Sequence, residues 1–264
     1  MNYVFNLQPS PKDDRDFLLE SIYPYSVALP ATLDLRSEMP SVRDQGQYGT
    51  CSAQTAAAMK EWQERVDVNF KNYMSPQFVY NLRENYGTEG MTPRDTMKIL
   101  YHVGIVPEKD YPYASSFENL DPSALKPTLA ETAAKYRISG YATIGTIDSL
   151  KKALLANGPC YIAFSVYNPE KREFWKPDFP NQEAMGGHAV TVVGWLKDSF
   201  IIRNSWSSQW GDGGYTYYKF VDWGFHWEVW TTIDADTSQD KLEQISCDRV
   251  GFLRKLFHRR IRQY

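Results

Sequence analysis

The sequence predicts an α+β protein whose first half is helical and whose second half is rich in β-strands. An alanine-rich run from Thr50 to about Val66 has strong helix formers at helical spacing. After about residue 113, short runs rich in Val, Ile, Tyr and Trp alternate with turn residues. With 264 residues, of which 42% are hydrophobic, the chain can bury one sizeable core or two smaller lobes.

The helices are placed by their start and stop signals. Ser75-Pro76 opens a segment that runs to about Asn85, and Gly104 ends a segment from Thr92 to Val103. A third segment, Asp148 to Ala156, is closed by Asn157-Gly158-Pro159, and a short helix-compatible patch spans residues 16–20. The expected strands are Cys160 to Val166, Ala189 to Trp195, Phe200 to Arg203, Gly214 to Phe220 and Trp227 to Ile233.

Charge and cysteine content exclude several classes of protein. A net charge of −3 does not indicate nucleic acid or an anionic membrane as a partner. No apolar run approaches the roughly 18 residues of a spanning helix, and the first residues lack a basic signal-peptide region. Three cysteines, Cys51, Cys160 and Cys247, are expected to be free thiols in a reducing compartment, so a cytoplasmic location is expected.

Cys51 is the best candidate for a nucleophile. It stands at the start of the alanine-rich helix, where unpaired N–H groups and the helix dipole favour the thiolate. Small buried cysteines are also common in protein cores, so its position alone leaves both interpretations open.

The residues around Cys51 favour the catalytic interpretation. The stretch Asp44-Gln45-Gly46-Gln47-Tyr48-Gly49-Thr50-Cys51-Ser52-Ala53 resembles the active-site signature of papain and the cathepsins. In that family the glutamine amide and the cysteine N–H form the oxyanion hole, which implies that Gln45 is a donor to the developing negative charge.

Two later blocks extend the resemblance. Gly186-Gly187-His188-Ala189-Val190 is similar to the histidine strand of the family, and Asn204-Ser205-Trp206-Ser207-Ser208-Gln209-Trp210-Gly211 is similar to its Asn-Ser-Trp block. The resemblance implies that His188 is the general base and acid and that Asn204 orients its ring. Trp206 would shield that hydrogen bond, and Trp210 would form a wall on the leaving-group side.

The resemblance covers roughly three-quarters of the chain and implies a papain-like fold, with a helical left lobe, a β-barrel-like right lobe and a cleft between them. It divides the chain into a leader (1–28), a peptidase domain (29–235, with lobes at about 29–112 and 113–235) and a tail (236–264). It resembles the compact forms without a long propeptide that occur in bacteria and large DNA viruses; for a virus, the virion is a second expected location. No cofactor or metal is expected, and the expected partner is a polypeptide substrate.

Several positions depart from the family pattern. The cysteines of a common disulfide are replaced by Tyr48 and Thr88, Ser52 stands in place of a tryptophan, and Gly187 replaces an Asp or Asn. Met91 replaces a glycine and is expected to narrow or reshape the non-prime side of the cleft. The expected substrate-binding residues are Gly90, Met91, Thr92, Pro93, Ala163, Gly187, Ala189 and Trp210, and they favour an apolar side chain at P2.

The leading hypothesis is an endopeptidase that forms a thioester on Cys51, with a resting thiolate–imidazolium pair. The alternatives are a catalytically silent papain-fold binding protein and a transpeptidase that uses the same residues. Residues 1–28 either lie along the cleft and restrain activity or form a strap on the outer surface, which is favoured. The tail is basic and amphipathic; docking on its own domain or on an acidic partner is favoured over contact with nucleic acid or a membrane.

Overall fold

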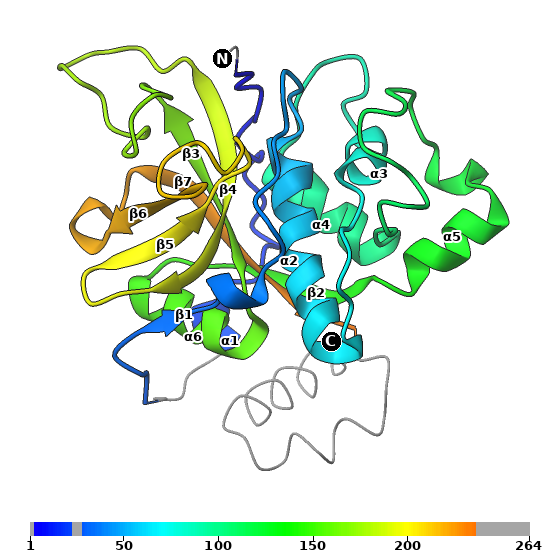
Figure 1. Cartoon of the computed structure of the whole chain (residues 1–264), viewed down its shortest axis with the longest axis horizontal. Helices are drawn as coiled ribbons and strands as arrows, with labels where there is room; N and C mark the ends of the chain where they lie inside the picture. Colours follow the sequence, from blue (N-terminus) through cyan, green and yellow to red (C-terminus); the bar gives the residue numbers. More distant parts are fainter. Residues whose placement is uncertain (1–2, 23–27, 236–264) are drawn as a thin grey trace.

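The computed structural model describes residues 3–22 and 28–235, which form a helical lobe and a sheet lobe side by side (Figure 1). The C-terminal tail lies outside the described residues, and so does Cys247. Among the described residues, no helix is both long enough and apolar enough to cross a bilayer.

The helical lobe is built around α2 (Cys51–Val68), which starts at Cys51 as the sequence predicts. Asn69 ends α2 in a left-handed conformation, and its N–H donates to the carbonyls of Glu64 and Arg65. α3 (Pro76–Asn81) is shorter than expected, while α4 (Pro93–His102) agrees with the prediction. Both begin with proline, and the hydroxyls of Ser75 and Thr92 accept hydrogen bonds from their first turns.

The sheet lobe is built on seven strands, β1 (Leu33–Asp34), β2 (Ile138–Thr143), β3 (Cys160–Val166), β4 (Gly186–Trp195), β5 (Ser199–Arg203), β6 (Tyr215–Lys219) and β7 (His226–Asp234). They form one antiparallel sheet in the order β2-β7-β3-β4-β5-β6, with β1 paired to β4. All five predicted strands are present.

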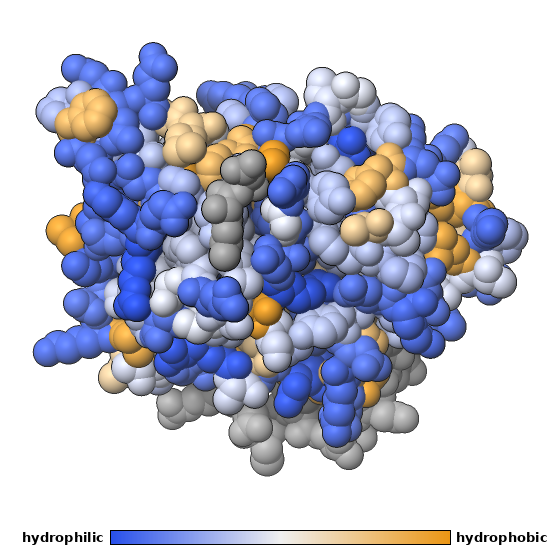
Figure 2. Space-filling model, turned by 45° about the horizontal axis from the view of Figure 1, so that its top comes forward, coloured by the Kyte–Doolittle hydropathy of each residue, from blue (hydrophilic) through white to orange (hydrophobic). Residues whose placement is uncertain are grey.

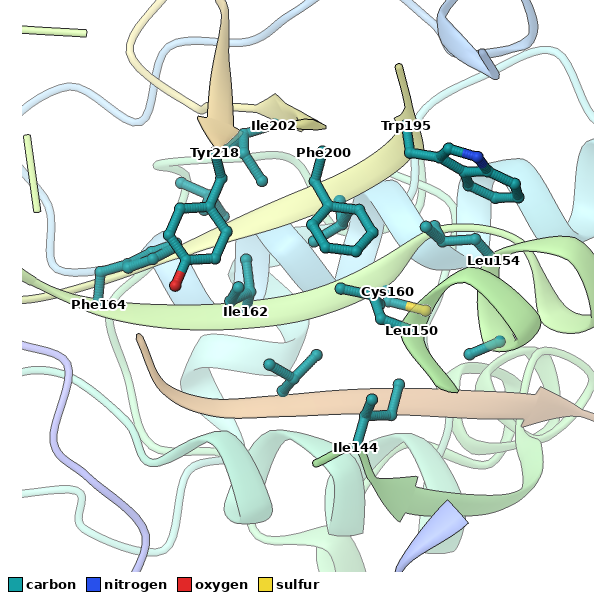
Figure 3. Close-up of a cluster of buried hydrophobic side chains, with 14 of the residues drawn as sticks. Ile144, Leu150, Leu154, Cys160, Ile162, Phe164, Trp195, Phe200, Ile202 and Tyr218 are labelled. Atoms are coloured by element: carbon teal, nitrogen blue, oxygen red, sulfur yellow. The ribbon is translucent and has the colours of Figure 1, made fainter. Parts of the chain in front are cut away.

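The core of this lobe lies between α6 (Ile147–Asn157) and one face of the sheet. Figure 3 shows Leu150 and Leu154 from α6 meeting the side chains of β3 and β5. Cys160 is fully buried there and forms part of this core. Cys51 and Cys160 are both free thiols.

The division of the chain between the lobes differs from the expected boundary at residue 112. α5 (Pro127–Ala134), which the sequence patterns did not reveal, belongs to the helical core, since Ala133 and Ile138 pack there with Leu125 and Leu129. Conversely, β1 joins the sheet lobe through the pairing of Leu33 with Trp195. The chain therefore crosses between the lobes more often than a single boundary allows.

The leader has two structurally distinct parts. α1 (Leu19–Ile22) docks on the sheet lobe, where Leu19 is fully buried in the core. Residues 3–16 instead run between the two lobes, where the dark blue chain descends from the N-terminus in Figure 1. The favoured placement of the leader as a strap on the outer surface is therefore wrong for residues 3–16.

Candidate active site

The N-terminus of α2 places the Cys51 thiol at the junction of the lobes. Cys51 is almost completely buried and packs in one apolar cluster with Ala189 of β4. Burial raises the pKa of this thiol to about 11, although backbone N–H groups of Ala189, Ser52 and Cys51 itself act in the opposite direction.

His188 follows Gly187 on β4, and its two ring nitrogens have different surroundings. Nε2 lies 2.8 Å from Oδ1 of Asn204, and the indole of Trp206 stacks on the imidazole with the centroids 4.3 Å apart. Nδ1 has no hydrogen-bond partner among the residues that the structure describes. The arrangement holds one nitrogen and leaves the other for proton exchange.

Burial also affects the charges of Cys51 and His188. The pKa of His188 falls to about 4, because desolvation outweighs the hydrogen bond that its Nε2 donates to Asn204. With the pKa of Cys51 near 11, the neutral thiol and the neutral imidazole are favoured at neutral pH in this form. The resting thiolate–imidazolium pair that the sequence led us to expect is thus disfavoured while the site is covered.

Gln45 is held in place from both lobes. Its Nε2 donates to the carbonyl of Tyr48 at 2.9 Å, and its Oε1 accepts from Ser205 Oγ at 2.7 Å. Its backbone N–H also donates to the carbonyl of Ser205 at 2.8 Å. One amide hydrogen of Gln45 remains for an oxyanion. Ser205 was missed as a site residue, although it directly follows Asn204 in the sequence.

Leader residues 3–8 cover these groups. The ring of Tyr3 stacks on Trp206 at 4.5 Å, and the ring of Phe5 meets that of His188 edge-on at 6.5 Å. Leu7 is 3% exposed and belongs to the apolar cluster that contains Cys51. The leader therefore removes both the thiol and the imidazole from water.

The backbone of the leader pairs with both walls of the cleft. The N–H of Gly187 donates to the carbonyl of Phe5, and the carbonyl of Gly187 accepts from Leu7. On the opposite wall, the N–H of Gln8 donates to the carbonyl of Met91 at 3.0 Å. The leader thus uses main-chain groups at two of the expected substrate-binding positions.

Two glycines make this close approach possible. A Cβ on Gly90 would lie 1.7 Å from the carbonyl oxygen of Asn6, and one on Gly187 would lie 2.4 Å from that of Leu7. The replacement of Asp or Asn by Gly187 therefore creates room for the leader backbone.

The leader runs through the cleft in the direction opposite to that expected for a substrate. Its N-terminal end, at Tyr3, stacks on Trp206, which packs against Trp210, the residue that the family resemblance places on the leaving-group side. Its later residue Gln8 lies at Met91, on the acyl side. The family resemblance places the N-terminal residues of a substrate at Met91, so the leader runs opposite to the direction expected for a cleavable peptide.

Leu7 marks an apolar pocket. Its cluster contains the expected residues Ala163 and Ala189 and others that sequence patterns did not single out, namely Met59, Met97, Tyr161 and Trp230. Ser52, in place of the bulky tryptophan, hydrogen-bonds through Oγ to Tyr161 Oη at 2.7 Å and to Thr96 Oγ1 at 2.6 Å. These hydrogen bonds hold the hydroxyl of Tyr161 next to Ser52 of α2, the position at which the family has a tryptophan.

The remaining expected substrate-binding residues have other contacts. The side chain of Met91 packs into the helical core, so the prediction that it narrows the cleft is wrong; only its carbonyl is used. Thr92 and Pro93 form the N-terminal end of α4, and their role in a pocket stays a prediction. Trp210 packs edge-on against Trp206 at 5.2 Å and donates from Nε1 to the carbonyl of Pro169.

On the face shown in Figure 2, apolar areas are separated by polar ones. The apolar side chains of Phe179 and Met185 are exposed, whereas Leu7 is buried. No group of three His, Cys, Asp or Glu residues in 3–22 and 28–235 could hold a metal ion.

Comparison with known proteins agrees with this geometry. Residues 29–222 match the family model described as papain family cysteine protease. The chain is 29% identical over 200 residues to cysteine proteinase 3 of Entamoeba histolytica, covering 71% of this chain and 62% of that protein. It is 27% identical over 201 residues to a cathepsin L-like proteinase of Phaedon cochleariae, covering 71% and 60%. The chain thus spans less than two thirds of the length of these relatives.

The structural comparison points to the same family. The crystal structure of xylellain, a cysteine protease from Xylella fastidiosa, matches with a TM-score of 0.70 and 28% identity, covering 88% of this chain and 96% of that one. The fold is also that of procathepsin L 3 from the midgut of Tenebrio molitor larvae, with a TM-score of 0.63, 22% identity and coverage of 80% and 72%. This chain belongs to the papain family of cysteine proteases.

Proposed function

We propose that this protein is a cysteine endopeptidase that cleaves polypeptides through a thioester on Cys51. The observation that supports this most directly is the state of His188. Nε2 of His188 is hydrogen-bonded to Asn204 and the ring is stacked on Trp206, while Nδ1 has no partner among the described residues. The next residue of the strand, Ala189, packs in one cluster with Cys51.

The proposed reaction has two halves. Nδ1 of His188 takes the thiol proton as Sγ of Cys51 attacks the scissile carbonyl carbon, and Gln45 Nε2 with the Cys51 N–H stabilises the oxyanion. His188 then gives the proton to the departing amine, which leaves a thioester. A water molecule, deprotonated by His188, attacks the thioester and returns the acid and the free thiol.

The proposed substrate is an unfolded or extended polypeptide with an apolar P2 residue. The pocket that holds Leu7 is lined by alanine, methionine and aromatic side chains, so it favours a side chain of similar size. The free state of Cys51 and Cys160 supports the further proposal of a reducing location such as the cytoplasm.

We further infer that residues 3–8 hold the full chain in an inhibited form. They bury the thiol and the imidazole, occupy the apolar pocket and bind in the non-productive direction. The inhibitory interpretation of the leader is therefore preferred to the strap.

A full-length Leu7→Asp variant tests the proposed activity. A carboxylate is costly to bury in the apolar pocket, so the leader should leave the cleft while residues 17–22 stay docked. Turnover of a fluorogenic peptide amide with leucine at P2 should be rapid in this variant and absent when Cys51→Ala or His188→Ala is added. A folded Leu7→Asp protein that cleaves no peptide but still binds peptides would favour the silent binding protein. Transfer of the acyl group mainly to added amines, seen by product analysis, would favour the transpeptidase.

A further inference from the structure

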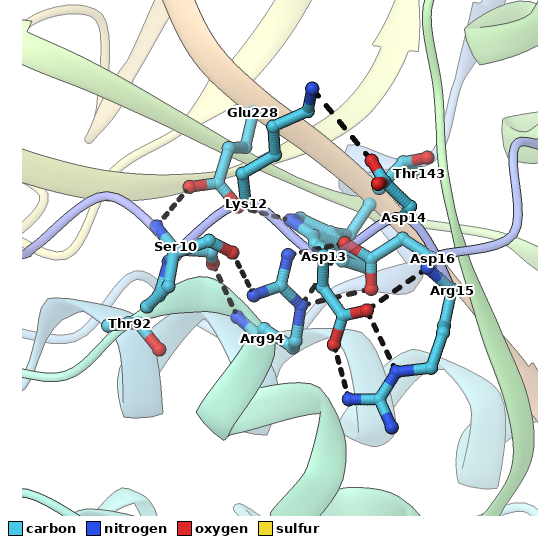
Figure 4. Close-up of polar contacts among 12 residues, drawn as sticks. Ser10, Lys12, Asp13, Asp14, Arg15, Asp16, Thr92, Arg94, Thr143 and Glu228 are labelled. Carbon is cyan, nitrogen blue, oxygen red and sulfur yellow. Dashed lines mark hydrogen bonds and ion pairs between the residues drawn. The ribbon is translucent and has the colours of Figure 1, made fainter.

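The leader is bound at two separate places, and the second lies beyond the catalytic residues. After Gln8 the chain reaches Arg94 of α4, in the helical lobe, and Glu228 of β7, in the sheet lobe. Figure 4 shows both side chains meeting leader residues 10–16. None of the described contacts of Arg94 or Glu228 involves Cys51, His188, Asn204 or Gln45.

Arg94 makes most of the contacts at this second place. Its backbone N–H donates to Ser10 Oγ at 3.0 Å, and its guanidinium donates to the carbonyl of Pro11. The same guanidinium forms a two-pronged ion pair with Asp16, including Nε to Oδ1 at 2.9 Å. The two side chains are only 11% and 17% exposed, so water weakens this pair less than a surface pair.

Glu228 completes the contact from the opposite lobe. Its Oε1 accepts from the N–H of Ser10 at 2.6 Å, while its Oε2 accepts from Nε1 of Trp230 at 2.9 Å. Trp230 also lies under the guanidinium of Arg94, with the ring centroid 5.8 Å from it, and belongs to the apolar cluster of Leu7. Ser10 is therefore hydrogen-bonded to both lobes, next to the apolar cluster of Leu7.

Leader residues after Asp16 are attached independently of the cleft. The carbonyl of Phe17 accepts from the N–H of Thr143 at 2.8 Å, and Glu20 Oε1 accepts from the N–H groups of Gly145 and Thr146 at 2.9 Å. Leu19 is fully buried in the core of the sheet lobe. These contacts do not depend on whether residues 3–16 occupy the cleft.

We propose that Arg94 and Glu228 form a latch that keeps the leader in the cleft, and that docked residues 17–20 act as its tether. The proposal rests on the proposed peptidase activity and adds its regulation. When the latch opens, residues 3–16 leave the cleft but stay attached to the protein, at an effective concentration on the order of 1 mM. Opening is reversible and needs no cleavage of the chain.

The test uses the full-length chain and measures kcat/KM for the leucine peptide amide. Arg94→Ala should raise kcat/KM by at least about tenfold toward the value of Leu7→Asp, because a buried partner of Asp16 is lost. Asp16→Asn should act in the same direction, and it carries the test if Arg94→Ala does not fold. The matched control is Lys98→Ala, on the same helix, whose pair with Glu84 is exposed; it should leave kcat/KM unchanged.

Two further measurements separate a latch from a general effect on stability. Intact-mass analysis of the activated Arg94→Ala protein should show an uncut chain. A synthetic peptide of residues 3–16 should inhibit Leu7→Asp competitively, and the same peptide with Asp16→Asn should inhibit at least about tenfold less well.

The outcomes are distinguishable from failure of the proposed activity. If Leu7→Asp is active while folded Arg94→Ala and Asp16→Asn both behave like the wild type, the latch is wrong and the peptidase stands. Activation that appears only together with loss of the leader mass would also overturn the reversible latch. If Leu7→Asp, Arg94→Ala and Asp16→Asn are all folded and inactive, the proposed activity itself fails, and the latch fails with it.

Discussion

Replacing Leu7 with alanine should activate the full-length protein, because Leu7 is the leader side chain most completely buried in the cleft. It is 3% exposed and packs in a cluster with Ala163, Ala189 and Trp230. Leu→Ala in a closed core costs about 2 to 5 kcal/mol, and we expect the lower end, since this pocket can admit water when the leader loosens. A loss of about 2 kcal/mol raises the open fraction roughly 30-fold, since about 1.4 kcal/mol corresponds to a factor of ten.

The assay is kcat/KM for a leucine peptide amide, measured below KM so that the rate follows the concentration of open enzyme. Leu7→Met is the matched control, because a change that keeps the volume costs less than about 1.5 kcal/mol and should activate far less. The kcat/KM of the Leu7→Asp variant gives the value expected for a fully open cleft. The reasoning fails if Leu7→Ala matches the wild type while Leu7→Asp is much more active, since burial of Leu7 would then contribute nothing to closure.

Three further predictions follow from other parts of the structure. The pKa of His188 is about 4 in the covered site, compared with an ordinary value of 6.5. The neutral ring therefore stabilises the covered form fully above about pH 6.5, and this stabilisation is lost as the pH falls toward 4. As the pH falls from neutral to about 5, the ratio of wild-type kcat/KM to Leu7→Asp kcat/KM should therefore rise by up to roughly 30-fold. A ratio independent of pH would refute this. Lys60→Met removes the fully buried cation that pairs with Asp234 and should cost about 3 to 5 kcal/mol of unfolding free energy in urea, whereas an unchanged midpoint would contradict the pairing. In the Leu7→Asp background, Ser205→Ala frees Gln45 Oε1 and should lower kcat about tenfold with little change in KM; an unchanged kcat would show that Gln45 needs no such support.

Much of the fold could be predicted because its strongest elements carry local signals. α2 is rich in alanine, and α4 and α6 have clear caps. β2 was missed because its buried positions are Ile138, Gly140 and Ala142, two of them too small to give an apolar pattern. α5 was missed because only Ala133 is buried in it.

The residues proposed as catalytic could be located from motifs, but the covering of the site could not. Cys51, His188 and Asn204 stand in recognisable blocks, and the structure places the His188 ring between Asn204 and Trp206 as expected. The path of Leu7 depends instead on backbone pairing with residues more than 80 positions away, at Met91 and Gly187. Short polar segments with a few apolar residues give no local sign of such pairing.

The leader also affects how activity should be measured. Removing residues 1–28 would take away Leu19, which is fully buried in the core of the sheet lobe, together with the part that covers the cleft. Low activity of such a truncated protein could then reflect lost stability. Substitutions of Leu7 in the full chain avoid this ambiguity.

Labelling by the epoxide inhibitor E-64 tests the central claim most directly, because it reports on the thiol itself. We predict one adduct per chain, located on Cys51 by peptide mass mapping, formed quickly in Leu7→Asp and slowly in the wild type, with Cys160 unmodified. A folded Leu7→Asp protein with no adduct on Cys51 would contradict the account. So would an adduct that forms at the same rate when His188 is changed to alanine.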